Sequence, residues 1–436
     1  MANNLLSVWG TIGSVLLAIL VLLVMITVHE FGHYLAGKIL HFKINEFSIG
    51  FGPALFKRKR KKSDEVFSIR LIPLGGYCSF ADEDGLEEEQ KEETAPEPFA
   101  EEFSENATEE SVPVEEIAEA APEEENPKKR KKKREVELGK FNDKKPWQRI
   151  IVLVSGALMN YILAVFLIII CFFAYGQTMT AVYRTAPIEG IPTEYTEENS
   201  LQDLDILLKA NGKSIYLTTD IAKAVNGKKA GDTVKFTVSR AYGVVWETNE
   251  KGEERPSFDH REVITVEVKL RSDVKVKNSA DLDSVWGALG IRQAESGGYE
   301  LASSSYRFGF FETLGRSFMY SFKIAGSIFK IIGELLTFNL NITALGGPVT
   351  TIAMTSKIAS SSFRGLLEIA GFIGVNLAVF NLLPIPALDG SKVVFTVIEW
   401  IRKKPISRKV EAVIHAVGFV LLLGFAVLVD ILQFVL

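Results

Sequence analysis

The stretch LLSVWGTIGSVLLAILVLLVMITVHEFGHYLAGK, residues 5–38, decides the fold. Before Lys38 its only charged residue is Glu30. As a helix this run would rise roughly 50 Å, well beyond the ~30 Å hydrocarbon core of a bilayer. A secretory signal peptide would begin with basic residues and end at a small-residue cleavage site, and the run shows neither feature. We therefore expect a transmembrane helix with ionisable residues inside its apolar length.

Apolar and charged residues are segregated along the chain. Its 436 residues are 47% hydrophobic and 24% charged. Residues 82–125 hold 20 acidic residues and one basic residue, so the remainder is net +14 although the chain is net −5. This segregation argues against a soluble enzyme and a plain nucleic-acid binder. Cys78 and Cys171 lie on a polar and an apolar segment, so we expect neither a disulfide framework nor a thiolate metal site.

Three more uncharged runs bring the expected number of membrane spans to four. They cover residues 150–176, 369–388 and 413–429. Basic residues cluster after the first span, before the second, and between the third and fourth. Because basic flanks stay on the cytoplasmic side, these connections should be cytoplasmic. Both termini and residues 177–308 should then lie outside.

The connection between the first two spans carries a charged insert. Residues 82–125 are rich in Glu, Ala and Pro, and residues 128–134 are seven consecutive basic residues. Such a composition buries too little apolar surface to offset its chain entropy, so we expect disorder. The alternative is a tether in which the basic block binds anionic lipid while the acidic block is repelled.

Residues 180–303 change to alternating patterns typical of a small α+β domain. The predicted elements are strands at 204–210, 233–240 and 263–270, a short helix at 219–225 and a long hairpin or loop at 241–262.

Residues 310–338 predict an amphipathic helix that lies on the membrane surface. Arg316, Lys323 and Lys330 recur every seven residues and therefore share one helical stripe. The alternative, a fifth span, would bury five charged residues and disturb the topology.

The sequence HEFGH at residues 29–33 points to metal chemistry. Residues four apart share a helix face, so His29 and His33 can reach one ion. Glu30 lies beside them, where it can accept a proton from water. Ionisable residues inside an apolar span are costly unless they are paired or metal-bound, so a packed polar pair is the weaker interpretation.

Catalytic zinc takes three protein ligands, so a third ligand is missing. Asp389 is our candidate because it is a polar residue well inside the apolar region 369–401. Pro384 and Pro386 break the helix just before it, and irregular backbone at membrane depth is tolerated only around a cavity or a site. His415, near the start of the fourth span, is the alternative ligand.

Five motifs together resemble the site-2 protease family of the RseP/RasP type. They are HEFGH at 29–33, FSIGFGP at 47–53, SGALMN at 155–160, GGPV at 346–349 and NLLPIPALDG at 381–390. The resemblance implies an intramembrane zinc metalloendopeptidase of the bacterial cytoplasmic membrane. Its substrates would be single-span proteins or peptides, such as anti-sigma factors trimmed by an upstream site-1 type protease, or remnant signal peptides.

The resemblance also assigns roles to residues. It implies that His29, His33 and Asp389 bind one zinc ion per chain and that Glu30 is the general base. Asn381 would contact the substrate backbone near the metal. Further residues are expected to serve substrate binding: Gly50 and Gly52 in a membrane-dipping β-hairpin, Pro384 and Pro386 beside Asp389, and a strand at 67–72 that pairs with unwound substrate.

The outer domain occupies the position of the family's PDZ domain. Residues 199–205 lack the Gly-rich stretch usual there, so we expect a size filter against bulky substrates rather than capture of C-terminal carboxylates. Two other functions stay open: a zinc transporter, which would need polar residues across the whole bilayer, and an adaptor with a vestigial metal site.

The predicted fold class is a polytopic α-helical membrane protein with about four transmembrane helices, a membrane-dipping β-hairpin and one extracytoplasmic PDZ-like α+β domain. We expect the segments 1–80 (first span and β-loop), 81–140 (insert), 141–178 (second span), 179–303 (PDZ-like domain), 304–365 (interfacial helix and GGP segment), 366–401 (third span with the aspartate motif) and 402–436 (basic loop and fourth span).

Overall fold

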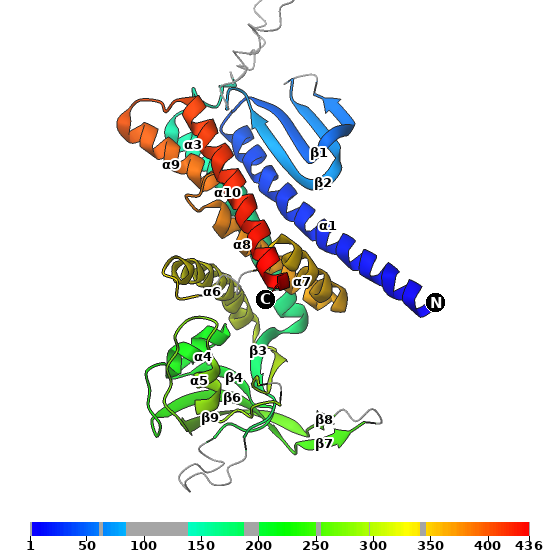
Figure 1. Ribbon diagram of the computed structural model, residues 1–436, viewed down its shortest axis with the longest axis vertical. Helices are drawn as coiled ribbons and strands as arrows, with labels where there is room; N and C mark the ends of the chain where they lie inside the picture. The colour runs from blue at the N-terminus through cyan, green and yellow to red at the C-terminus, as the bar shows by residue number, and fades with distance from the viewer. Residues whose placement is uncertain are drawn as a thin grey trace, which may run out of the picture.

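The computed structural model describes residues 2–60, 64–83, 138–186, 200–249, 254–295, 297–340 and 346–435 (Figure 1). Most of the predicted charged insert, from residue 84 to residue 134, lies outside the described residues.

Four helices of the described chain are long and apolar enough to cross a membrane, as predicted. They are α1 (Ala2–Ile39), α3 (Pro146–Tyr175), α8 (Phe363–Asn381) and α10 (Arg408–Val435). The third helix differs from the expected run at 369–388. It begins earlier because Ser362 caps it, accepting the Gly365 N–H at 3.0 Å. It ends at Asn381 because Pro384 cannot continue a helix.

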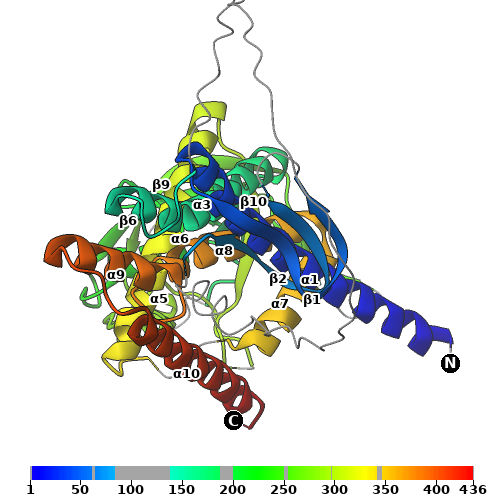
Figure 2. The same cartoon turned by 90° about the horizontal axis from the view of Figure 1, so that it is seen from above.

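Helix α3 packs against both α1 and α8. Small residues allow these close contacts. A Cβ added at Gly32 of α1 would lie 2.4 Å from the Ser155 carbonyl oxygen, and one at Gly374 of α8 would lie 2.9 Å from Ala164 Cβ. In contrast, only 11% of the membrane-span window of α10 is buried, and Figure 2 shows this helix lying apart from α1.

Strands β1 (Ile44–Lys59) and β2 (Val66–Phe80) each bend and pair twice. Phe47 pairs with Cys78 on one side and with Phe67 on the other, and Phe67 also pairs with Arg58. The resulting order of stretches is 76–80, 44–49, 66–70 and 54–59. The prediction that strand 67–72 pairs with substrate is therefore wrong for residues 67–69, which are paired on both sides. The stretch 76–80 lies at one edge of this sheet instead.

The second sheet forms the β domain, residues 177–306. Its strands are β3 (Gln177–Val182), β4 (Ile206–Ala210), β5 (Lys213–Ser214), β6 (Thr233–Tyr242), β9 (His260–Lys269) and β10 (Leu301–Tyr306). They run in the order β10-β3-β4-β6-β9, with β5 beside β4. Helices α4 (Thr218–Val225) and α5 (Asp283–Ala288) complete the domain, and β7 (Val245–Thr248) and β8 (Glu254–Ser257) form a hairpin. Strands β4, β6 and β9 and helix α4 correspond to the predicted elements.

Helix α6 (Phe310–Leu336) is the predicted amphipathic helix and is not among the four candidate spans of the described chain. Its basic stripe contacts the β domain. Arg316 is buried and donates to Gln177 Oε1 at 2.6 Å and to the Ile215 carbonyl at 2.5 Å. Lys323 forms an ion pair with Asp220 at 2.7 Å. The stripe therefore anchors the domain to the helices.

Two helices complete the fold, α7 (Pro348–Ser361) and α9 (Asp389–Arg402). Asp430 of α10 caps α7 by accepting the backbone N–H groups of Val349 at 2.9 Å and Thr350 at 3.2 Å. In Figure 1 the β1–β2 sheet lies at one end of the helices, whereas the β domain and both labelled termini lie toward the other end.

Candidate metal centre

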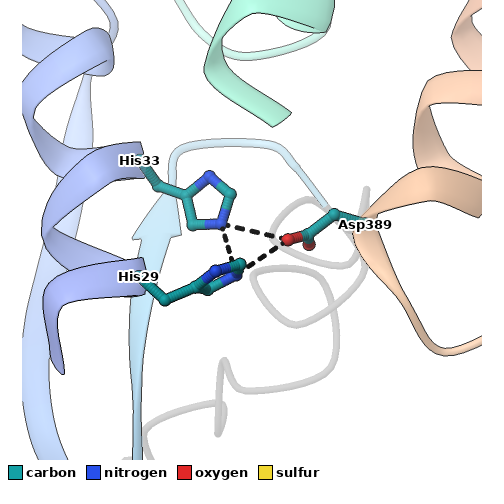
Figure 3. Close-up of side chains that lie close together, drawn as sticks. All are labelled: His29, His33 and Asp389. Atoms are coloured by element: carbon teal, nitrogen blue, oxygen red, sulfur yellow. Dashed lines mark hydrogen bonds and ion pairs between the residues drawn. The ribbon is translucent and has the colours of Figure 1, made fainter. Parts of the chain in front are cut away.

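Three predicted ligands meet where α1 faces the start of α9 (Figure 3). His29 Nε2 lies 2.9 Å and His33 Nε2 lies 3.2 Å from Asp389 Oδ2. The two Nε2 atoms are 3.1 Å apart. Both histidines are only 7% exposed. Residues from opposite ends of the sequence thus present three ligand atoms to one point.

This spacing fits a zinc site. Tetrahedral ligands bonded to zinc at about 2.0–2.1 Å stand about 3.3 Å from one another. The three separations in the structure are close to that value, and two imidazole nitrogens plus a carboxylate oxygen form a donor set that catalytic zinc accepts. A fourth position remains for water or substrate.

The Nδ1 atoms of both imidazole rings, which face away from the metal centre, contact polar groups of α3 and α8. His33 Nδ1–H donates to the Val152 carbonyl of α3 at 2.8 Å, which leaves the lone pair of Nε2 toward the centre. His29 Nδ1 faces the side-chain amides of Asn160 at 3.5 Å and Asn381 at 3.3 Å. A metal-bound His29 carries its proton on Nδ1 and needs an acceptor there.

Asn160 meets that need and was not singled out from the sequence. It is fully buried, and its Oδ1 has no hydrogen-bond partner in the described structure. The two orientations of an asparagine amide have nearly the same shape, and the second one places Oδ1 on His29 Nδ1–H. The sequence feature that could have identified Asn160 is a side-chain amide inside an apolar span.

Glu30 lies between the two histidines and the edge stretch 76–80. Its carboxylate accepts a hydrogen bond from the Cys78 backbone amide. A Cβ added at Gly76 would lie 3.5 Å from Glu30 Cγ. Glu30 is thus beside the three ligands without being one of them. Burial, together with the nearby Glu30 carboxylate, raises the pKa of the Cys78 thiol.

The other predicted site residues lie at two places in the fold. Asn381 ends α8 with its amide at His29, and Pro384 and Pro386 lie in the segment that joins α8 to α9. Gly50 and Gly52 lie where β1 bends, with φ of +87° and +82°. A residue with a side chain is strained in that conformation, so the bend requires glycine.

His415, the alternative ligand, has a different role. Its Nδ1 accepts the Ala387 backbone N–H at 3.0 Å. Ala387 has φ of +78°, a strained value for a residue with a side chain. Nearby, a Cβ added at Gly418 would lie 2.3 Å from Pro386 Cβ. Helix α10 therefore holds in place the loop that leads to Asp389 at the start of α9.

We expect His415→Leu to weaken zinc binding by about 10- to 100-fold, because the strained loop loses its hydrogen bond. His415→Asn keeps an acceptor at the same distance along the side chain and should restore most of the affinity. Competition with a chelator measures both. Equal zinc affinity in the wild type and the Leu variant would contradict this role.

Comparison with known proteins gives a consistent result. The Peptidase family M50 profile matches residues 17–425. The zinc metalloprotease RasP of Bacillus licheniformis is 28% identical over 446 residues, covering 94% of this chain and 96% of that protein. A candidate zinc metalloprotease of Clostridium perfringens is 28% identical over 419 residues, covering 96% and 97%. One from Staphylococcus aureus is 26% identical over 454 residues, covering 94% and 95%.

Proposed function

Because this chain belongs to Peptidase family M50 and is a zinc metalloprotease, we propose that it hydrolyses peptide bonds in the membrane-spanning segments of single-span substrates. The observation that carries the proposal is the convergence of His29, His33 and Asp389 beside Glu30. Trimmed anti-sigma factors and remnant signal peptides are the proposed substrate classes, with an upstream site-1 type protease supplying the former.

The contacts at the metal centre suggest a catalytic role for each of its residues. His29, His33 and Asp389 bind one zinc ion per chain, whose Lewis acidity activates water and polarises the scissile carbonyl. Glu30 takes the proton from the attacking water and gives it to the leaving amine. Asn160 and the Val152 carbonyl hold the imidazole rings in the protonation state that each role requires.

A helical substrate must unwind before its peptide bonds can be reached. We propose that the unwound segment adds to the edge stretch 76–80, because the Cys78 backbone of this stretch already reaches Glu30. Asn381 would hold the substrate backbone near the metal. Gly50 and Gly52 in a membrane-dipping hairpin, with Pro384 and Pro386, would line the path to it.

We propose a bacterial cytoplasmic membrane location with the charged insert inside the cell. Both termini and the β domain, as a PDZ-like domain, would lie outside. Two observations support this orientation. Basic residues 57–60 and 402–404 flank the spans at the end that carries the β1–β2 sheet, and Figure 1 places both termini toward the β domain.

Metal removal tests the activity. Purified protein should cleave a truncated single-span substrate in detergent, lose cleavage on chelation, and regain it when one equivalent of zinc per chain is returned. Bound zinc and cleavage are measured on the same samples. A protein that contains zinc and cleaves nothing would favour the adaptor function, and zinc flux in sealed vesicles would favour the transporter.

We also propose that the β domain excludes substrates with bulky outer domains. Deleting residues 180–303 joins Met179 to Ser304, which are directly paired in the β3–β10 ladder, so a two-residue turn can close the gap. The deletion should allow cleavage of an untrimmed substrate that the intact protein leaves uncut. A substrate without an outer domain serves as control and should be cut by both. If the untrimmed substrate stays uncut while the control is cut, the domain is no filter.

A further inference from the structure

A groove lies between α1 and the β1–β2 sheet, outside the metal centre. Its cavity volume is about 800 Å³. Its wall is a continuous row of aromatic rings, with centroid separations of 5.3 Å for Tyr34–Phe47 and 6.0 Å for both Phe31–Tyr34 and Phe47–Phe67. We name it the α1–β groove.

The α1–β groove opens away from the metal. His29 and His33 are buried toward α3, whereas Phe31 and Leu35 on another face of the same helix are 42% and 40% exposed. The sheet continues this apolar surface with Phe56, whose ring lies 6.4 Å from that of Phe67, and with its cross-strand partner Ile69, at 49% and 40% exposure. Apolar side chains exposed to this extent on both elements mark a surface that contacts the membrane or another molecule.

The rim of the α1–β groove is basic. Arg58, Lys59 and Arg60 line it. Lys59 pairs with Asp64 at 2.9 Å, and Glu65 is shared between Lys38 at 2.5 Å and Arg60 at 3.9 Å. Lys57 and Arg58 form no ion pair within the described part of the chain. The cations therefore outnumber the acids that neutralise them.

We propose that the α1–β groove binds an anionic phospholipid, with its phosphate on Arg58 and its neighbours and an acyl chain along the aromatic wall. Depth supports this occupant, because the groove lies near the C-terminal end of the span Ile12–Ile39, where Lys38 marks the headgroup level. Arginine binds phosphate through two parallel hydrogen bonds, and basic residues at the membrane surface are attracted to anionic lipid. A lipid seated there bridges α1 to the sheet.

The test uses the full chain in detergent, titrated with phosphatidylglycerol, phosphatidylcholine or inorganic phosphate. Native mass spectrometry reports binding and thermal unfolding reports stabilisation. Phosphatidylglycerol should bind at least tenfold more tightly than phosphatidylcholine and raise the unfolding temperature, whereas inorganic phosphate should do neither. Equal protection by inorganic phosphate would overturn the lipid proposal in favour of a simple anion site.

Two pairs of charge-removing variants test whether the lipid binds in the α1–β groove. Arg58→Gln with Arg60→Gln should reduce phosphatidylglycerol binding to the phosphatidylcholine level. Arg402→Gln with Lys404→Gln removes the same charge from exposed residues outside the groove and should leave the preference intact. Equal loss in both pairs would show general charge attraction and sink the proposal. Should the first pair fail to fold, Arg58→Gln alone, which breaks no ion pair within the described residues, gives the same comparison.

Discussion

Glu30→Gln is expected to lower the cleavage rate by about 10²- to 10⁴-fold, the usual contribution of a general base, while bound zinc stays at the wild-type level. The amide has the shape of the carboxylate and can still accept the Cys78 backbone N–H, so the fold should not change. What is lost is the ability to take a proton from water. Cleavage of the truncated substrate and zinc content, measured on the same preparation, check both parts.

Two further variants serve as controls for Glu30→Gln. Glu312→Gln changes an exposed acid on α6 and should alter neither quantity. Asp389→Asn removes a charged ligand and should lose zinc together with activity. The outcome that contradicts our assignment is a Glu30→Gln protein that keeps wild-type cleavage, or one that loses its zinc, because Glu30 would then be a bystander or a ligand.

The ligand set could be predicted from local features of the sequence. The spacing of His29 and His33 places both rings on one helix face, and an aspartate after two prolines in an apolar run has few structural uses. The structure brings these three residues together, with Asp389 preferred over His415. The supporting amide of Asn160 was missed because its role depends on how α3 crosses α1, which no local pattern records.

The other differences between prediction and structure arise largely from contacts between segments that are distant in the sequence. The resemblance implied a strand at 67–72, but the sequence does not record that β1 folds around it and pairs with residues 67–69 on both sides. Helix α8 begins before the uncharged run because Ser362 caps it, and the two charged residues of its first turns, Arg364 and Glu368, pair with each other at 2.9 Å. The spacing of the basic residues on α6 predicted a helix on the membrane surface but not their partner, and in the structure Arg316 is buried against the β domain.

Helix α3 lies so close to the two histidine ligands that a side chain at Gly156 is expected to disturb the metal site. A Cβ added at Gly156 would lie 2.4 Å from His33 Nε2 and 2.8 Å from His29 Cε1. Contacts this short cannot persist, and the obstacle on the other side is the rigid ring of a ligand rather than the end of a flexible chain. The histidines must therefore move away from Asp389 or the helices must separate.

Gly156→Ala should weaken zinc binding by about 100-fold and reduce cleavage in parallel, although a single methyl group is added and no ligand is changed. Gly424→Ala is the matched control, because it adds the same group to membrane-spanning α10 where no atom lies within 4 Å. Chelator competition measures zinc affinity, and thermal unfolding separates a local effect from loss of the fold. If Gly156→Ala retained zinc and activity at the level of Gly424→Ala, the tight crossing of α3 over the two histidines would not be a requirement of the site.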